Sequence, residues 1–152
     1  KVVRIGVERM NLSAITVSFP LDEETFEELQ NLCKVAEIDG HVYHQVMNLP
    51  VARNYDMRGF YVLVYDDEKN ELVGACVINH THMNQYNPEN FLVFLAVDKN
   101  QRRNGYGKMI MDEAVKVTHG DIYLHISSDN PAKVLYEKYG FTTPYIEMRY
   151  KK

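Results

Sequence analysis

The stretch "NQRRNGYGKMIMDEA", residues 100–114, joins an apolar strand-like run to a helix-like run through a short basic loop. It combines arginines, glycines and a lysine, and its first carboxylate is Asp112. The first N–H groups of a helix have no acceptor within the helix and carry the positive end of its dipole, so such a position suits an anion. Gly105 and Gly107 permit close approach and positive φ angles. We therefore expect residues 102–108, which we call the anion turn, to bind phosphate.

Two common nucleotide motifs do not fit the anion turn. A P-loop places Ser or Thr after its lysine, but Met109 follows Lys108. A dinucleotide-binding fingerprint needs a third glycine where the chain has Ile110. What remains is Arg-x-x-Gly-x-Gly, from Arg102 to Gly107. Taken alone, this short pattern fits equally well a solvated basic helix start that binds nothing.

A second motif lies downstream in "AKVLYEKYGF" (132–141), a helix-like run that carries a tyrosine and ends in Gly-Phe. Together with "FLAVDKNQRRNGYGK" (94–108), it resembles the two signatures of the GNAT superfamily of acetyl-CoA-dependent N-acetyltransferases. The two motifs occur in the order and at the distance typical of that family. The resemblance covers residues 60–150, and the first 55 residues match only in outline.

Apolar periodicity and turn residues predict a mixed α/β chain. The resemblance implies a GNAT-like fold, in which a central, mostly antiparallel sheet of six or seven strands is flanked by about four helices. Strands 91–97 and 121–127 are expected to run parallel and splay apart. We expect residues 1–152 to form a single acetyltransferase domain. The expected elements are strands 2–7 and 14–19, helices 21–38 and 41–50, strands 58–66, 71–80 and 90–97, helix 105–119, strand 121–127, helix 131–140 and strand 145–150.

The resemblance also implies how acetyl-CoA is held. The pantetheine arm would pair with the backbone of Leu95, Ala96 and Val97 like an added strand. Asn130 would contact the pantetheine or adenosine end, although a one-residue offset from the family pattern lets Asp129 take the same role. The pyrophosphate would be bound by backbone amides, with help from the arginine charge. The residues concerned are Arg102, Arg103, Asn104, Gly105, Tyr106, Gly107 and Lys108.

The chemistry requires an amine to attack the thioester and a thiolate to leave. Tyr136 is the expected general acid, because a tyrosine pKa of about 10 lies near that of a thiol. A strand N–H near Ala96 or Val97 would stabilise the oxyanion. Leu92 stands where some relatives carry a glutamate base, so that mechanism does not transfer. The base is left open among water and four side chains, which are His80, His82, Glu89 and His125.

Composition narrows the remaining function classes. The net charge of −4, from 17 basic and 21 acidic residues, argues against a general nucleic-acid binder. No apolar run approaches the ~20 residues that span a bilayer, and no signal-peptide pattern is present. Cys33 and Cys76 lie in apolar contexts and are expected to be buried free thiols, which favours a cytoplasmic location. His80-x-His82 lacks the further ligands of a zinc site, so we expect no metal.

Residues 21–39 hold seven acidic residues and one lysine, which suits either a cationic amine or an ordinary solvated helix face. The expected function is therefore transfer of an acetyl group from acetyl-CoA to a primary amine of a small molecule or peptide. The expected partners are that amine acceptor and a possible second copy of the chain, with no nucleic acid or membrane. The alternative is a catalytically silent module that binds or senses acyl-CoA.

Overall fold

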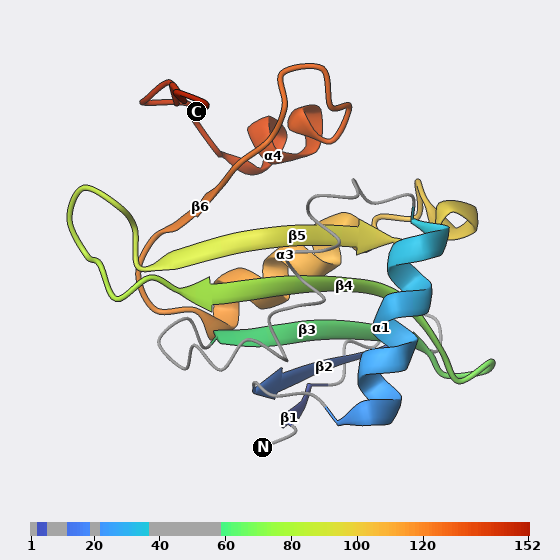
Figure 1. Ribbon diagram of the computed structural model, residues 1–152. Coiled ribbons are helices and arrows are strands. Elements are labelled where there is room, and N and C mark those ends of the chain that lie inside the picture. Colours follow the sequence, from blue (N-terminus) through green and yellow to red (C-terminus); the bar gives the residue numbers. More distant parts are fainter. Residues whose placement is uncertain (1–2, 6–11, 19–21, 37–58) are drawn as a thin grey trace.

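A computed structural model describes residues 3–5, 12–18, 22–36 and 59–152 (Figure 1). The predicted helix 41–50 lies outside these residues. A 3-10 turn (Lys99–Gln101) links two of the described elements. In chain order the elements are β1 (Val3–Ile5), β2 (Leu12–Ser18), α1 (Glu23–Val35), β3 (Gly59–Asp66), β4 (Glu71–His80), β5 (Asn90–Val97), α3 (Tyr106–Val117), β6 (Ile122–Leu124) and α4 (Lys133–Tyr139).

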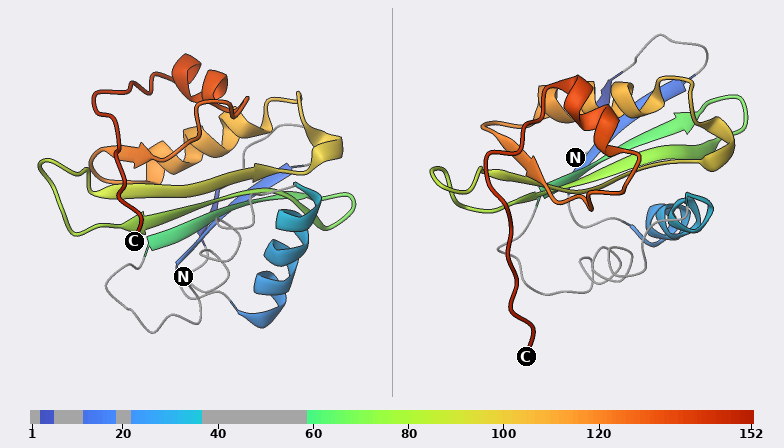
Figure 2. Two further views of the ribbon diagram at one scale, coloured as in Figure 1. Left: turned by 45° about the horizontal axis from the view of Figure 1, so that its top comes forward. Right: turned by 90° about the horizontal axis from the view of Figure 1, so that it is seen from above.

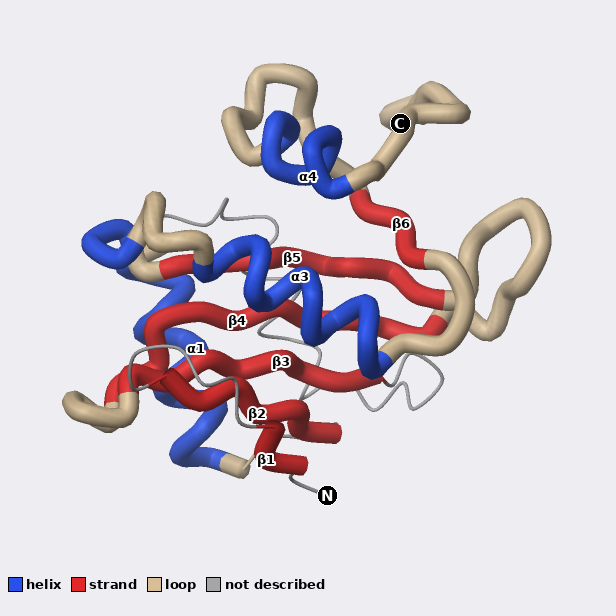
Figure 3. The backbone as a smooth tube through the Cα atoms, turned by 180° about the vertical axis from the view of Figure 1, so that it is seen from behind, coloured by secondary structure: helices blue, strands red, loops and turns tan. Residues whose placement is uncertain are grey.

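The strands form one mixed sheet in the order β1-β2-β3-β4-β5-β6. Neighbours are antiparallel as far as β5, and β5 and β6 run parallel. α1 covers one face of the sheet and α3 the other, with α4 on the α3 side (Figures 2 and 3). The predicted GNAT-like mixed α/β fold is confirmed. The total of six or seven strands stays a prediction, and the described residues contain three α-helices rather than about four.

The apolar spacing of the helices explains how they pack on the sheet. Leu29, Leu32 and Cys33 share one side of α1, and all three are buried in the cluster on that face of the sheet. Ile110 and Met111 do the same for α3 on the opposite face. Burying each such side chain contributes about 1.5–3 kcal/mol to folding. The sheet is therefore fixed from both sides, as the apolar run in β5 predicted.

β5 contains a bulge at Val93. Val77 of β4 pairs with Phe94, whereas the next residue of β4 pairs with Leu92, so Val93 has no counterpart. The extra residue inverts the alternation of the side chains. Leu92 packs in the cluster under α3, and Phe94 and Ala96 pack in the cluster under α1. The bulge thus places Leu92 on one face of the sheet and the alternate residues after it, Phe94 and Ala96, on the other.

The prediction of a final strand over 145–150 is wrong, since this segment forms no strand in the structure. Its side chains are exposed, and Figure 2 shows residues 141–152 extending from the body of the molecule. The sequence alternates as a strand does, but β-propensity reflects packing against a neighbouring strand. Within the part of the chain that the structure describes, no strand pairs with this segment. The predicted strand 121–127 is likewise shorter, spanning Ile122–Leu124.

Cys33 and Cys76 are free and buried, as predicted. They pack in the clusters on opposite faces of the sheet. Burial raises the pKa of Cys33 to about 11 and that of Cys76 to about 12, so both stay protonated near neutral pH. Among the described helices, none has the length and apolar character needed to cross a bilayer.

Candidate functional site

The anion turn begins where the chain leaves β5. The side chain of Asp98 accepts a hydrogen bond from the Asn100 N–H at 2.9 Å, which folds the 3-10 turn. Arg103 and Gly105 then adopt left-handed conformations, with φ of 69° and 79°. Left-handed residues on both sides of Asn104 bend the backbone into a tight concave turn. This geometry is the one that lets neighbouring N–H groups converge on one anion.

The first turn of α3 continues the anion turn. Gly105 is the N-cap and makes no side-chain cap bond, and no acid lies in the first turn. The Met109 N–H donates to the Gly105 carbonyl at 3.1 Å. The helix therefore provides no acceptor for the N–H groups of residues 106–108. A side chain at Gly107 would lie 3.1 Å from Leu135 Cδ2, so glycine also permits α4 to pack here.

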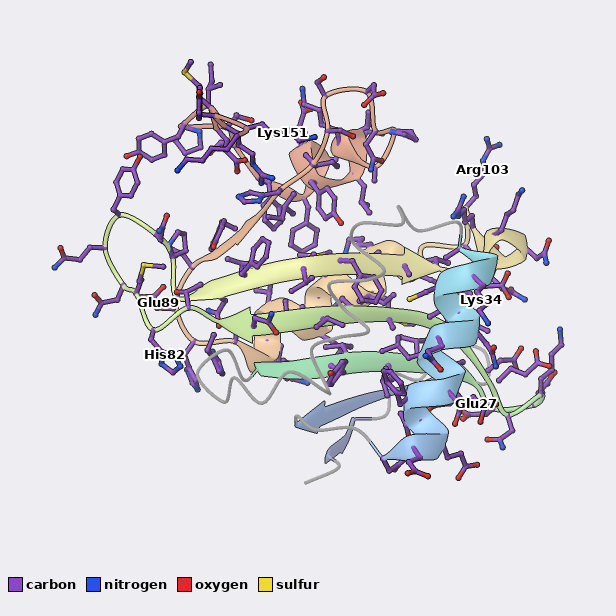
Figure 4. The ribbon with its side chains drawn as sticks, viewed as in Figure 1. Glu27, Lys34, His82, Glu89, Arg103 and Lys151 are labelled. Atoms are coloured by element: carbon purple, nitrogen blue, oxygen red, sulfur yellow. The ribbon has the colours of Figure 1, made fainter. Side chains whose placement is uncertain are left out.

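The three basic side chains of the turn are placed differently. Arg103 is exposed and points away from the molecule (Figure 4). Lys108 Nζ lies 2.9 Å from Asp112 Oδ2, one helical turn on. Arg102 Nη2 donates to the Ala36 carbonyl at 2.7 Å, which lies 66 residues away at the end of α1. The i, i+4 spacing could have revealed the first pair, but no local pattern indicates the second.

An open strand edge lies between the anion turn and β6. β5 pairs with β6 only at Asn90, Phe91 and Leu92. Beyond Leu92 the described strands leave that edge of β5 unpaired, while its other edge stays bonded to β4. Leu95, Ala96 and Val97 therefore have one strand edge open to an extended ligand. The bulge at Val93 lies where the pairing ends.

Tyr136 lies on α4 and packs in the core cluster on the α3 face of the sheet. Its side chain is 7% exposed and meets the Phe141 ring edge-on, with ring centroids 5.6 Å apart. Burial, with a smaller contribution from Cys76, raises the pKa of Tyr136 to about 12, so the hydroxyl stays protonated. The Gly-Phe motif has a structural reason. Gly140 ends α4 with a φ of 116°, and the Phe141 N–H donates to the Tyr136 carbonyl at 3.0 Å.

Asn130 lies at the turn before α4. Its backbone N–H donates to the Ser127 carbonyl at 3.0 Å, and its side-chain oxygen accepts from the Ala132 N–H at 2.9 Å. Asn130 and Asp129 are both exposed. The side-chain oxygen of Asn130 thus shapes the entry to the helix, and its amide nitrogen is the group available to a ligand.

The candidate bases lie at different distances from the open edge. Glu89 and His82 lie at the opposite end of the sheet from Arg103 (Figure 4). Glu89 Oε2 accepts a hydrogen bond from the Asp121 N–H at 2.9 Å and thereby stabilises the turn before β6. His80 ends β4 at the same end of the sheet, where it pairs with Asn90.

His125 differs from the other three candidate bases. It follows β6 directly, next to the point where Leu124 makes the last pairing with β5. Its ring centroid is 5.3 Å from that of Phe91, and its Nε2 is 3.2 Å from Glu147 Oε2. Among the four side chains, His125 is therefore the one adjacent to the open edge. In the described chain, no three His, Cys, Asp or Glu side chains gather as a metal site would require.

Comparison with known proteins identifies relatives of this arrangement. The family model "Acetyltransferase (GNAT) domain" matches residues 57–143. The fold resembles that of a putative acetyl transferase from Pyrococcus furiosus, with a TM-score of 0.67 and 19% identity over 91% of this chain and 99% of that one. It also resembles the aminoglycoside N-acetyltransferase AAC(6')-Iy in complex with CoA, with a TM-score of 0.66 and 12% identity over 97% and 99% of the two chains.

Two curated relatives match a shorter region. Cysteine-rich protein 2-binding protein from mouse and from human is 38% identical over 60 residues. This segment is 39% of the present chain and 8% of the length of each relative. The match therefore concerns one small part of those proteins.

Proposed function

This chain belongs to the GNAT family of acetyltransferases, and on that premise we propose that it transfers an acetyl group from acetyl-CoA to a primary amine of a small molecule or peptide. The observation that carries the proposal is the anion turn at one end of an open strand edge. The anion turn can bind a diphosphate, and the open strand edge can bind an extended amide-containing arm. We further propose that residues 1–152 form a single acetyltransferase domain with the sheet of six or seven strands typical of the family.

The residues present fit acetyl-CoA. The N–H groups of residues 106–108 and the left-handed Arg103 and Gly105 suit the pyrophosphate. The backbone of residues 95–97 suits the pantetheine arm, and the amide nitrogen of Asn130 suits its far end. A relative with this fold, AAC(6')-Iy, has been solved with CoA. When bound, the cofactor supplies the thioester that carries the acetyl group.

Tyr136 is the proposed general acid. Its pKa is raised to about 12, so it keeps its proton at neutral pH. The same burial makes it a weaker proton donor to a leaving thiolate than a tyrosine whose pKa lies near 10. The bulge at Val93 takes a residue out of the β4 ladder next to the open edge. A backbone N–H at this bulge is therefore a second candidate oxyanion donor beside those of Ala96 and Val97. His125 is the proposed base, acting directly or through water, because it adjoins the same edge.

The proposed acceptor is a cationic amine. Exposed acids line α1, among them Glu23 and Glu24 and Glu27, which Figure 4 labels. A surface of one charge sign raises the local concentration of an oppositely charged substrate. Several solved structures with this fold are named as aminoglycoside acetyltransferases. This supports testing polyamines and aminoglycosides before neutral amino acids.

The direct test follows thiol release from acetyl-CoA with a panel of polyamines, aminoglycosides, amino acids and peptides. We expect thiol release well above background hydrolysis with at least one cationic amine, and the acetylated amine should be found by mass spectrometry. Binding of acetyl-CoA without turnover on any amine would instead indicate the catalytically silent module. Absence of binding at millimolar acetyl-CoA would contradict the cofactor assignment itself.

A further inference from the structure

Arg102 connects the anion turn to α1. Its Nη2 donates a 2.7 Å hydrogen bond to the Ala36 carbonyl, and Ala36 is the C-cap residue of α1. The carbonyls in the last turn of a helix have no partner within it and carry the negative end of the dipole. A guanidinium is a favourable partner there. The contact joins residues 66 positions apart, so it is a tertiary link between two elements.

The chemistry of the guanidinium permits a second partner at the same time. Arginine has five N–H donors in a planar fork, and the Ala36 carbonyl takes one of them. The Arg102 backbone lies in the anion turn, directly before the left-handed Arg103. Donors that do not face Ala36 can therefore bind an anion held by the turn. An anion bound in this way would hold the side chain in the orientation that caps α1.

We propose that Arg102 is a positioning residue that couples occupancy of the anion turn to the stability of the last turn of α1. The inference rests on the proposed function, since the anion is the diphosphate of acetyl-CoA. Binding at the turn reduces the freedom of Arg102, so the α1 cap costs less entropy once the cofactor is in place. By linkage, if the bound cofactor tightens the binding of a ligand at the end of α1 by a given factor, that ligand tightens cofactor binding by the same factor. Cofactor and acceptor therefore bind with positive cooperativity if the acceptor contacts α1.

Hydrogen–deuterium exchange of the purified protein tests the coupling without measuring activity. Saturating acetyl-CoA should slow amide exchange both in the anion turn, residues 102–108, and in the last turn of α1, residues 33–36. We expect a slowing of at least about fivefold in α1, the lower end of ordinary coupling between sites. In Arg102→Met the anion turn should stay protected by acetyl-CoA, while the protection of α1 disappears.

Lys99→Met is the matched control, because it removes the same charge from the 3-10 turn just before the anion turn but leaves the bond from Arg102 to Ala36 intact. It should keep both protections. If Arg102→Met loses the protection of the anion turn as well, Arg102→Lys replaces it, since lysine keeps the charge but not the fork. Protection of α1 that persists in Arg102→Met and Arg102→Lys would overturn the coupling, as would faster exchange of α1 on cofactor binding. An anion turn that acetyl-CoA does not protect in the unchanged protein would instead overturn the proposed function and the coupling with it.

Discussion

The two ends of β5 differ in whether their polar groups have hydrogen-bond partners. At the N-terminal end, Asn90 is fully buried, and its Nδ2 donates to the carbonyls of His119 at 2.6 Å and Asp121 at 3.2 Å. Glu89 accepts from the Asp121 N–H close by. Side chains thus bind backbone groups at this end, although the buried Asn90 Oδ1 has no hydrogen-bond partner among the described residues. At the C-terminal end, α3 begins with N–H groups for which the helix provides no acceptor.

This difference separates polar side chains that stabilise the fold from backbone N–H groups that are available to a ligand. A polar side chain that satisfies a neighbouring backbone group stabilises the fold, because a buried backbone group without a partner is costly. Glu89 and Asn90 are of this kind. The N–H donors at the start of α3 have no acceptor within the helix, and no acidic side chain lies in its first turn. Changes at the C-terminal end should therefore affect binding and turnover, and changes at the N-terminal end should affect stability.

Gly107→Glu should have the largest effect, because it adds both a side chain against Leu135 and a negative charge within the anion turn. Acetyl-CoA at 100 times its Kd should stabilise the unchanged protein by about 2.7 kcal/mol. For a chain of this size, that is a rise in Tm of roughly 5–10 °C. Gly107→Glu should abolish the rise, as measured by thermal denaturation with and without acetyl-CoA.

The control for this change adds the same charge at the other end of the sheet. Gln85 is exposed in the loop between β4 and β5, so Gln85→Glu should keep the full rise in Tm. A Gly107→Glu protein that still gains several degrees with acetyl-CoA would show that the anion turn is not the cofactor site. It would also remove the distinction between the two ends of β5.

Tyr136→Phe should have the next largest effect and should separate chemistry from binding. Loss of a general acid typically costs 10²-fold or more in turnover, so we expect kcat to fall by about 10²-fold. The rise in Tm with acetyl-CoA should be unchanged. Tyr139→Phe is the matched control, since it removes a hydroxyl that donates to Asp112 at 2.7 Å and leaves Tyr136 intact. Equal loss in both variants would indicate that α4 packing, rather than proton donation, explains the effect.

The pH dependence of kcat tests the same residue. Burial disfavours the charged phenolate and raises the pKa of Tyr136 to about 12. The acid form therefore persists as the pH rises, and kcat should show no alkaline decrease due to this group below roughly pH 10. A decrease with a midpoint near pH 8 that is present in the unchanged protein and absent in Tyr136→Phe would contradict the raised pKa, while still identifying Tyr136 as the proton donor.

Local patterns in the sequence predicted much of the C-terminal end of β5. The glycines and arginines of residues 102–108 indicated the anion turn, and Gly105 has the left-handed backbone that such a turn uses. Gly107 does not have it, and Arg103 adopts it instead. The Gly-Phe motif likewise predicted where α4 ends. These features depend on residues close together in the chain, so their signals are local. Which of these residues bind the cofactor remains a prediction.

Features that depend on distant contacts could not be predicted in this way. The bulge at Val93 is invisible in a run of apolar residues, because both faces of β5 are buried and either register satisfies the pattern. The bond from Arg102 to Ala36 joins elements whose proximity only the fold creates. The expected strand 145–150 failed for the same reason, since its alternation carries no information about a neighbouring strand.

Glu89→Gln provides the most discriminating test of the N-terminal end of β5. Glu89→Gln keeps an oxygen that can accept from the Asp121 N–H, so stability should change by less than about 1 kcal/mol. Turnover should be unchanged, as measured by the initial rate of thiol release. A fall of about 10²-fold would make Glu89 the base, and the N-terminal end of β5 would then belong to the active site.

Gly120→Ala tests the same hydrogen bond, between Glu89 and the Asp121 N–H, through a change in the neighbouring residue. Gly120 has a φ of 84°, and a β-carbon there would collide with the Glu89 carboxyl group. The backbone strain and the displacement of the Glu89 carboxyl group should lower the free energy of unfolding by about 1–2 kcal/mol, measured by denaturant titration. The rise in Tm with acetyl-CoA should persist, because the anion turn lies at the far end of β5. Intact stability together with weakened cofactor binding would reverse the roles assigned to the two ends.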